Sequence, residues 1–168
     1  MVNRLEYSFR KKEIIEIREY HDGNYGARGK KRIKKKKPTE EQMRLVNAQN
    51  KARRCRHRLL EYFTPGDCFG TWTYAMGNRP PDMAAALKDF QKAIRKVRVE
   101  YKKRGYELFW IRNIERGTKG AWHIHFVVNE IGDTASIMQK AWTKGGTYSV
   151  EIRNDPKIYD EDFTKLAA

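Results

Sequence analysis

The second half of the chain switches between two hydrophobic periodicities. Residues 68–76 are rich in β-branched and aromatic side chains and lie between turn sequences, which predicts a strand. From residue 83 to residue 104 apolar side chains recur every three or four positions, which predicts a helix with one stripe facing a core. Asp82 precedes this helix as a cap and Gly105 ends it. The same patterns predict strands at 107–115 and 121–128, a short helix at 134–142, a strand at 147–153 and a helix from residue 160 onward.

This order, β-α-β-β-α-β and then a helix, predicts an α+β fold of the split β-α-β, ferredoxin-like type. We expect an antiparallel sheet with the helix at 83–104 covering the face that holds Trp110, Ile124 and Phe126. The other face would remain available for substrate and for the last helix.

The first third of the chain is simpler in pattern. Residues 40–63 predict a helix, because Pro38-Thr39 and two acids stand at its start and a weak apolar stripe follows. Residues 14–20 fit either a short strand or a helix. We therefore expect a basic arm at 1–37, a basic helix at 38–66 and a domain at 67–168 that stops within its last helix.

Charge indicates the kind of partner. Lys and Arg number 36 against 21 Asp and Glu, a formal net charge of +15 with a pI near 9.9, which is typical of nucleic-acid-binding proteins. A protein that is merely basic remains an alternative. The side chains expected to contact phosphates are Lys30, Lys31, Arg32, Lys34, Lys35, Lys36 and Lys37 in the arm, and Arg53 and Arg54 in the helix. A solvated linker is the alternative for the arm.

Targeting features are missing from the sequence. No apolar run approaches 18 residues and the N-terminus has no apolar signal region, so we expect neither a membrane span nor secretion. Cys55 and Cys68 are too few for a disulfide framework, which favours the cytoplasm.

The two strands around the turn at 116–120 carry the candidate chemistry. His123 and His125 are two residues apart, so both imidazoles project from one face of their strand. Glu115 lies opposite His123 if the loop holds an odd number of residues, whereas a two-residue turn at Thr118-Lys119 would send the carboxylate to the other face. Two imidazoles and a carboxylate could hold a divalent metal with open positions.

Paired histidines on an apolar strand are also often structural, and that alternative stays open. A metal beside a phosphodiester would act as a Lewis acid, which suits a basic protein. On the first strand Thr71 and Thr73 share a face and could touch the DNA backbone, while Trp72 and Tyr74 are expected to be buried on the opposite face. Tyr148 alternates with apolar residues and is expected in the core.

These motifs resemble a known family. Phe69-Gly-Thr-Trp-Thr-Tyr74 resembles the first motif of rolling-circle replication initiators, and Trp122-His-Ile-His-Phe126 resembles their second. The resemblance is to the His-hydrophobe-His (HUH) single-strand endonucleases, especially the small initiator proteins of phages and plasmids in Gram-positive bacteria. It implies that Glu115, His123 and His125 bind Mg²⁺ or Mn²⁺. It also implies single-stranded or hairpin origin DNA as substrate and the host replication machinery as a partner.

The family's nucleophile is a tyrosine in a Tyr-x-x-Lys motif on the helix after the last strand, where it forms a 5′-phosphotyrosine link. Here Asp162 to Ala168 match the lead-in to that motif and the sequence ends where the tyrosine would follow. Tyr159 is the nearby candidate, but it precedes the expected helix and has Asp162 in place of the lysine. We therefore expect an N-terminal piece that binds metal and DNA but does not nick.

Two other classes of function remain. A transposase or a plasmid-transfer relaxase of the same superfamily would share the histidine pair, although relaxases usually carry three histidines, and Glu115 favours the replication type. A non-catalytic basic nucleic-acid-binding module with structural histidines is the second. Metal titration would separate the enzymes from the module.

Overall fold

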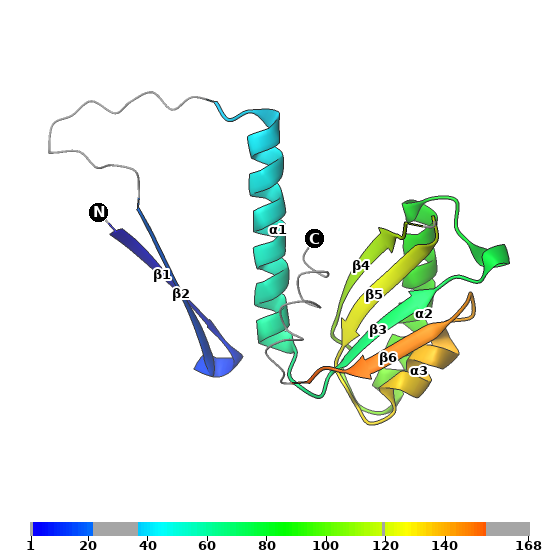
Figure 1. The fold of residues 1–168 in the computed structure, drawn as a ribbon. Coiled ribbons are helices and arrows are strands. Elements are labelled where there is room, and N and C mark those ends of the chain that lie inside the picture. Colours follow the sequence, from blue (N-terminus) through cyan, green and yellow to red (C-terminus); the bar gives the residue numbers. More distant parts are fainter. Residues whose placement is uncertain (1, 22–36, 119, 154–168) are drawn as a thin grey trace, which may run out of the picture. The chain divides into compact units, whose positions relative to one another are not determined.

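The protein is described by a computed structural model that covers residues 2–21, 37–118 and 120–153 (Figure 1). The chain divides into two units, residues 1–61 and 62–168. Within the covered ranges no helix combines the length and the apolar character that crossing a membrane requires.

The first unit contains an antiparallel hairpin and a helix. Strands β1 (Val2–Phe9) and β2 (Ile14–His21) pair through the short 3₁₀ turn Arg10–Lys12, so the undecided segment at 14–20 is a strand. Helix α1 spans Glu40–Tyr62, as its capping sequence predicts. Thr39 and Gln42 form a reciprocal capping box: the Gln42 N–H donates to Thr39 Oγ1 at 3.2 Å, and the Thr39 N–H donates to Gln42 Oε1 at 2.9 Å.

One side of α1 contacts the hairpin. Glu16 pairs with Arg56 and lies 3.4 Å from His57 Nε2. The His57 ring packs against Tyr7 and Phe9, with ring centroids 4.7 and 5.0 Å apart. His57 is therefore a half-buried packing residue of this unit.

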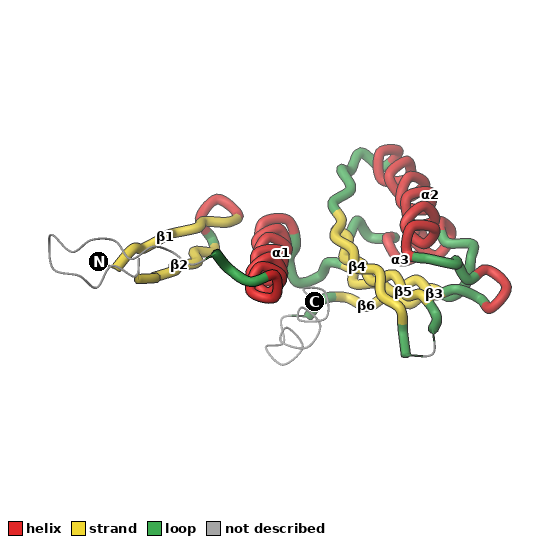
Figure 2. The backbone as a smooth tube through the Cα atoms, turned by 90° about the horizontal axis from the view of Figure 1, so that it is seen from above, coloured by secondary structure: helices red, strands yellow, loops and turns green. Residues whose placement is uncertain are grey.

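The second unit is the predicted α+β domain. Its elements are β3 (Cys68–Thr73), α2 (Met83–Lys103), β4 (Trp110–Arg116), β5 (Trp122–Val128), α3 (Thr134–Ala141) and β6 (Thr147–Glu151). The strands form one antiparallel sheet in the order β4-β5-β3-β6. In this order β5 separates β3 from β4, which is the split β-α-β arrangement that the element sequence predicts. Both helices lie on the same side of the sheet (Figures 1 and 2).

The core fills the space between the helices and this face of the sheet. Ile124 and Phe126 are fully buried, and Trp110 packs against the same cluster, so the expected core face is confirmed. Trp72 is also fully buried and stacks on Trp142 with ring centroids 4.9 Å apart and an interplanar angle of 4°. Gly70 leaves room for the Phe126 ring, because a Cβ at residue 70 would lie 2.2 Å from Phe126 Cε2.

The prediction that Tyr148 lies in the core is wrong. Its side chain is 61% exposed, and it pairs with Thr71 on the face that the helices leave open. Strand β6 does alternate, but it is an edge strand whose apolar residues point to the uncovered face. Alternation marks two faces of a strand without saying which one a helix covers.

Candidate functional site

The open face of the β4-β5-β3-β6 sheet carries two cross-strand rows of polar and aromatic side chains. The register aligns Asn113, His125, Thr71 and Tyr148 in one row across all four strands. The neighbouring row contains Glu115, His123 and Thr73. Every metal ligand expected from the sequence therefore lies on this face, in adjacent rows.

The β4–β5 loop sets the register. The Gly117 N–H donates to Ala121 O at 2.8 Å, and the Gly120 N–H donates back to Gly117 O at 2.8 Å. Gly120 has φ of +78°, the left-handed conformation that closes a three-residue hairpin loop. The loop is odd in length, and Glu115 is paired with His123. The two-residue turn that would have reversed the carboxylate is not formed.

The carboxylate of Glu115 makes its hydrogen bond to His125, the diagonal neighbour, and not to His123. His125 Nε2 lies 2.8 Å from Glu115 Oε1, and His125 Nδ1 lies 2.9 Å from Thr71 Oγ1. The His125 side chain is 21% exposed and that of Glu115 is 50% exposed. A long side chain reaches a diagonal partner easily, because such neighbours lie within about 7–8 Å at Cα. Thr71 and Glu115 together fix the His125 ring from both nitrogens.

His123 stands apart from this pair. The two imidazole rings are nearly parallel, at 19°, with centroids 6.2 Å apart. The His123 ring lies over the start of the loop, where a Cβ on Gly117 would be 3.3 Å from His123 Nε2. Across residues 2–21, 37–118 and 120–153 no three His, Cys, Asp or Glu side chains converge closely enough to hold a metal ion.

The donor set nevertheless suits a divalent cation. Two ligands at about 2.1 Å and a right angle are roughly 3.0 Å apart, close to the 2.8 Å between His125 Nε2 and Glu115 Oε1. Two imidazoles bound to one metal at a right angle would bring their ring centroids to roughly 4.6 Å, well inside the observed separation of 6.2 Å. A separation of 2.8 Å is also the ordinary length of a hydrogen bond, so a metal would replace that bond, and His123 would have to turn toward the pair.

The basic residues predicted to contact DNA differ in their surroundings. Lys30 to Lys36 lie outside the described residues, whereas Lys37 is exposed just ahead of α1. Arg53 is half-buried and donates from Nη2 to Asn50 Oδ1 at 2.6 Å. Arg54 is exposed, and its Nε makes a long contact of 3.4 Å to the Asn50 carbonyl. The two neighbouring arginines therefore differ in their availability to a phosphate.

Sequence reasoning named Arg54 but missed the basic stripe on α1 to which it belongs. Lys51, Arg54 and Arg58 are three and four residues apart, so they share one face of the helix, and all three are exposed. Arg56 and His57 lie on a different face and contact β2. The spacing of three and four residues between these basic side chains was the signal in the sequence that could have revealed the stripe.

The threonines of β3 have intramolecular contacts of unequal strength. The Thr71 hydroxyl is engaged with His125, as described above. The Thr73 hydroxyl donates to Gly146 O at 3.3 Å. Tyr148, in the row of Thr71, is a further functional candidate that the sequence pattern had assigned to the core. Tyr159 and the expected helix at 160–168 lie outside the described residues.

Comparison with known proteins identifies the family. No curated protein and no solved structure was found to match the chain. Residues 67–161 match the family model of the replication-associated protein ORF2, a range that includes every strand of the sheet above. This match covers more than half of the chain, and the protein therefore belongs to the replication-associated protein ORF2 family.

Proposed function

We propose that this protein initiates rolling-circle DNA replication as a single-strand DNA nickase of the His-hydrophobe-His type. Its substrate would be single-stranded or hairpin origin DNA, bound on the open face of the β4-β5-β3-β6 sheet. The observation that carries the proposal is the chain of contacts from Thr71 through His125 to Glu115 on that face. Membership of a replication-associated family supports the same role.

Glu115, His123 and His125 would hold a divalent cation, Mg²⁺ or Mn²⁺. When bound, the cation would draw negative charge from a non-bridging oxygen of the scissile phosphate. The orientation of His125 suits ligand binding through Nε2. In the structure this nitrogen faces Glu115 Oε1, and in a metal site it would present its lone pair to the cation. The proton of the neutral ring would then be on Nδ1 and be donated to Thr71 Oγ1, which can act as donor or acceptor.

The covalent step requires a tyrosine hydroxyl. Its oxygen would bond to phosphorus while the bond from phosphorus to the 3′ oxygen breaks, and the 3′ oxygen would leave as a hydroxyl after taking up a proton. One phosphoester bond forms as another breaks, so the reverse step rejoins the strand. Tyr159 is the nearby tyrosine in the sequence, although it precedes the expected helix and has Asp162 where the motif has lysine, and it lies outside the described residues.

Tyr148 and the stripe on α1 would supply binding. The exposed Tyr148 ring, in the row of His125, offers a surface on which a base can stack, a contact worth about 1–3 kcal/mol. Lys51, Arg54 and Arg58 would neutralise DNA phosphates.

Two measurements test the proposal. Titration with Mn²⁺ should show one site in the 168-residue chain, and His123→Ala or His125→Ala should weaken it. Incubation with labelled origin single strand and Mn²⁺ then tests for a covalent adduct. An adduct that disappears in Tyr159→Phe but persists in Tyr148→Phe would assign the nucleophile. Failure of the wild-type chain to bind Mn²⁺ would remove the basis of the nickase proposal.

A non-catalytic DNA-binding module is the second candidate. The distance of His123 from the Glu115–His125 pair favours it, because structural histidines need not converge. This candidate predicts that His123→Ala leaves the affinity for both Mn²⁺ and DNA unchanged.

A further inference from the structure

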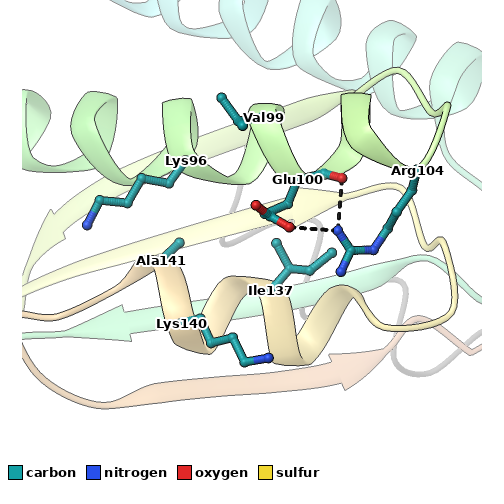
Figure 3. Close-up of a pocket in the computed structure, with 7 residues that line it drawn as sticks. All are labelled: Lys96, Val99, Glu100, Arg104, Ile137, Lys140 and Ala141. Atoms are coloured by element: carbon teal, nitrogen blue, oxygen red, sulfur yellow. Dashed lines mark hydrogen bonds and ion pairs between the residues drawn. The ribbon is translucent and has the colours of Figure 1, made fainter.

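A groove runs between α2 and α3, the two helices that cover the core face of the sheet (Figure 3). Its volume is about 490 Å³, and the side chains that line it are Lys96, Val99, Glu100, Arg104, Ile137, Lys140 and Ala141. Because it lies on the helical side of the domain, it is separate from the histidine face.

The groove combines apolar and basic lining residues. Val99 is 52% exposed on α2, and it lines the groove. Ile137 and Ala141 of α3 are nearly buried and close the groove on its other wall. Apolar side chains in a concave site favour a ligand that itself brings an apolar group.

The acidic residue in the groove is already neutralised. Glu100 accepts hydrogen bonds from Lys103 at 2.7 Å and from Arg104 at 2.8 Å, and these contacts lower the pKa of its carboxyl. Arg104 also bonds Asp133 at 2.8 Å. Glu100 and Arg104 thus satisfy each other between the helices, as Figure 3 shows.

The two lysines that line the groove remain available. Within the described part of the chain neither Lys96 nor Lys140 forms an ion pair, and both are exposed. The exposed surface of α2 adds further positive charge, from Lys88, Lys92, Arg95, Arg98 and Lys102. The electrostatic complement of this groove is therefore an anion.

We propose that the α2–α3 groove is a docking site for an acidic peptide segment of a partner protein, with an apolar side chain inserted between the helices. Lys96 and Lys140 would pair with its carboxylates, and Val99 would contact its apolar side chain. Nucleic acid is the less suitable ligand, because the lining contains no aromatic side chain on which a base could stack. Since the groove and the histidine face lie on opposite sides of the sheet, peptide and origin DNA would bind together. The proposal does not depend on metal binding or nicking.

The test uses the full 168-residue chain and a short fluorescent peptide of Asp and Glu residues with two central leucines. Its anisotropy should rise on binding, and a matched peptide with serines in place of the leucines should bind more weakly. The double variant Lys96→Glu/Lys140→Glu should weaken binding roughly tenfold or more. Val99→Ser should weaken it without any change in charge.

The control is Lys88→Glu/Arg98→Glu, which makes the same change in net charge on α2 outside the groove. Circular dichroism melts should show that all variants fold. Equal losses in the control and groove variants, equal binding of the leucine and serine peptides, or no binding of the leucine peptide would each overturn the proposal. Displacement of the peptide by single-stranded DNA would identify a nucleic-acid surface instead and overturn it as well.

Discussion

Thr71→Val tests the organisation of the candidate metal site without touching a ligand. The substitution keeps a β-branched side chain of nearly the same volume in a strand, so the fold should persist. It removes the hydroxyl that lies 2.9 Å from His125 Nδ1. The ring would keep its contact to Glu115 and lose the Thr71 restraint on the opposite nitrogen.

The effect should be larger on metal affinity than on stability. A net contribution of about 1 kcal/mol is typical for a neutral hydrogen bond, and it corresponds to a decrease of about 3 °C in Tm for a chain of this size. Loss of the group that orients a ligating histidine typically weakens metal binding by about 10–100-fold, or about 1.4–2.7 kcal/mol. A large loss of Mn²⁺ affinity with a small decrease in Tm would indicate a contact that orients a ligand. A purely structural contact would lower Tm and leave the Mn²⁺ affinity nearly unchanged.

Isothermal titration with Mn²⁺ measures the affinity, and thermal melts in chelator measure the stability. Thr73→Val is the matched control, because it makes the same chemical change on the same face of β3, where the hydroxyl contacts Gly146 O at 3.3 Å. Equal Mn²⁺ affinities for Thr71→Val and the wild type, or equal losses in the two variants, would refute the assigned role of Thr71.

Three further predictions follow from contacts, burial and charge. Gly145→Ala should lower Tm by about 10 °C, because a Cβ there would lie 2.2 Å from a β3 backbone oxygen; Gly77→Ala, with no atom within 4 Å, should have little effect in the same melt. Burial raises the pKa of the Cys68 thiol from 9.0 to about 12, so between pH 9 and 12 the thiol ionises in the unfolded chain and stays protonated in the folded one. The free energy of unfolding should therefore fall as the pH rises through this range. Denaturant unfolding at several pH values in which Cys68→Ala shows the same dependence of the free energy of unfolding on pH would contradict this. Arg54→Ala should lower the slope of log affinity for DNA against log salt by about 1, and Arg53→Ala by less, because Arg53 is held by Asn50; equal slopes would contradict the difference.

The fold of the second unit was predictable because each element carries its own signal. The stripe of α2 and its Asp82 cap, whose Oδ1 accepts from the Ala85 N–H at 2.7 Å, are local features that sequence spacing records. Sheet order followed from the sequence of elements and the split β-α-β rule. The face of Tyr148 was not predictable from β6 alone, because the helices that decide which face is covered come from distant parts of the chain.

The sequence predicted which candidate ligands lie on neighbouring strands, but it left the register open between an odd-length loop and a two-residue turn, and it did not predict the side-chain pairing. Gly117 and Gly120 indicate a tight loop, and its odd length places Glu115 opposite His123. The choice of His125 as the hydrogen-bonding partner depends on side-chain torsions and on Thr71, a residue 54 positions away in the sequence. Long-range contacts of this kind leave no periodic signal in the strand that carries the histidines.

The contacts of Glu115 also define what metal binding would require of the protein. The carboxylate and His125 Nε2 now satisfy each other, so a cation must separate a hydrogen-bonded pair before it gains two ligands. The exposure of Glu115 keeps this cost small, because water can solvate the carboxylate as the pair opens. His123 would supply the third ligand by turning its ring away from the loop, where its Nε2 now lies beside Gly117.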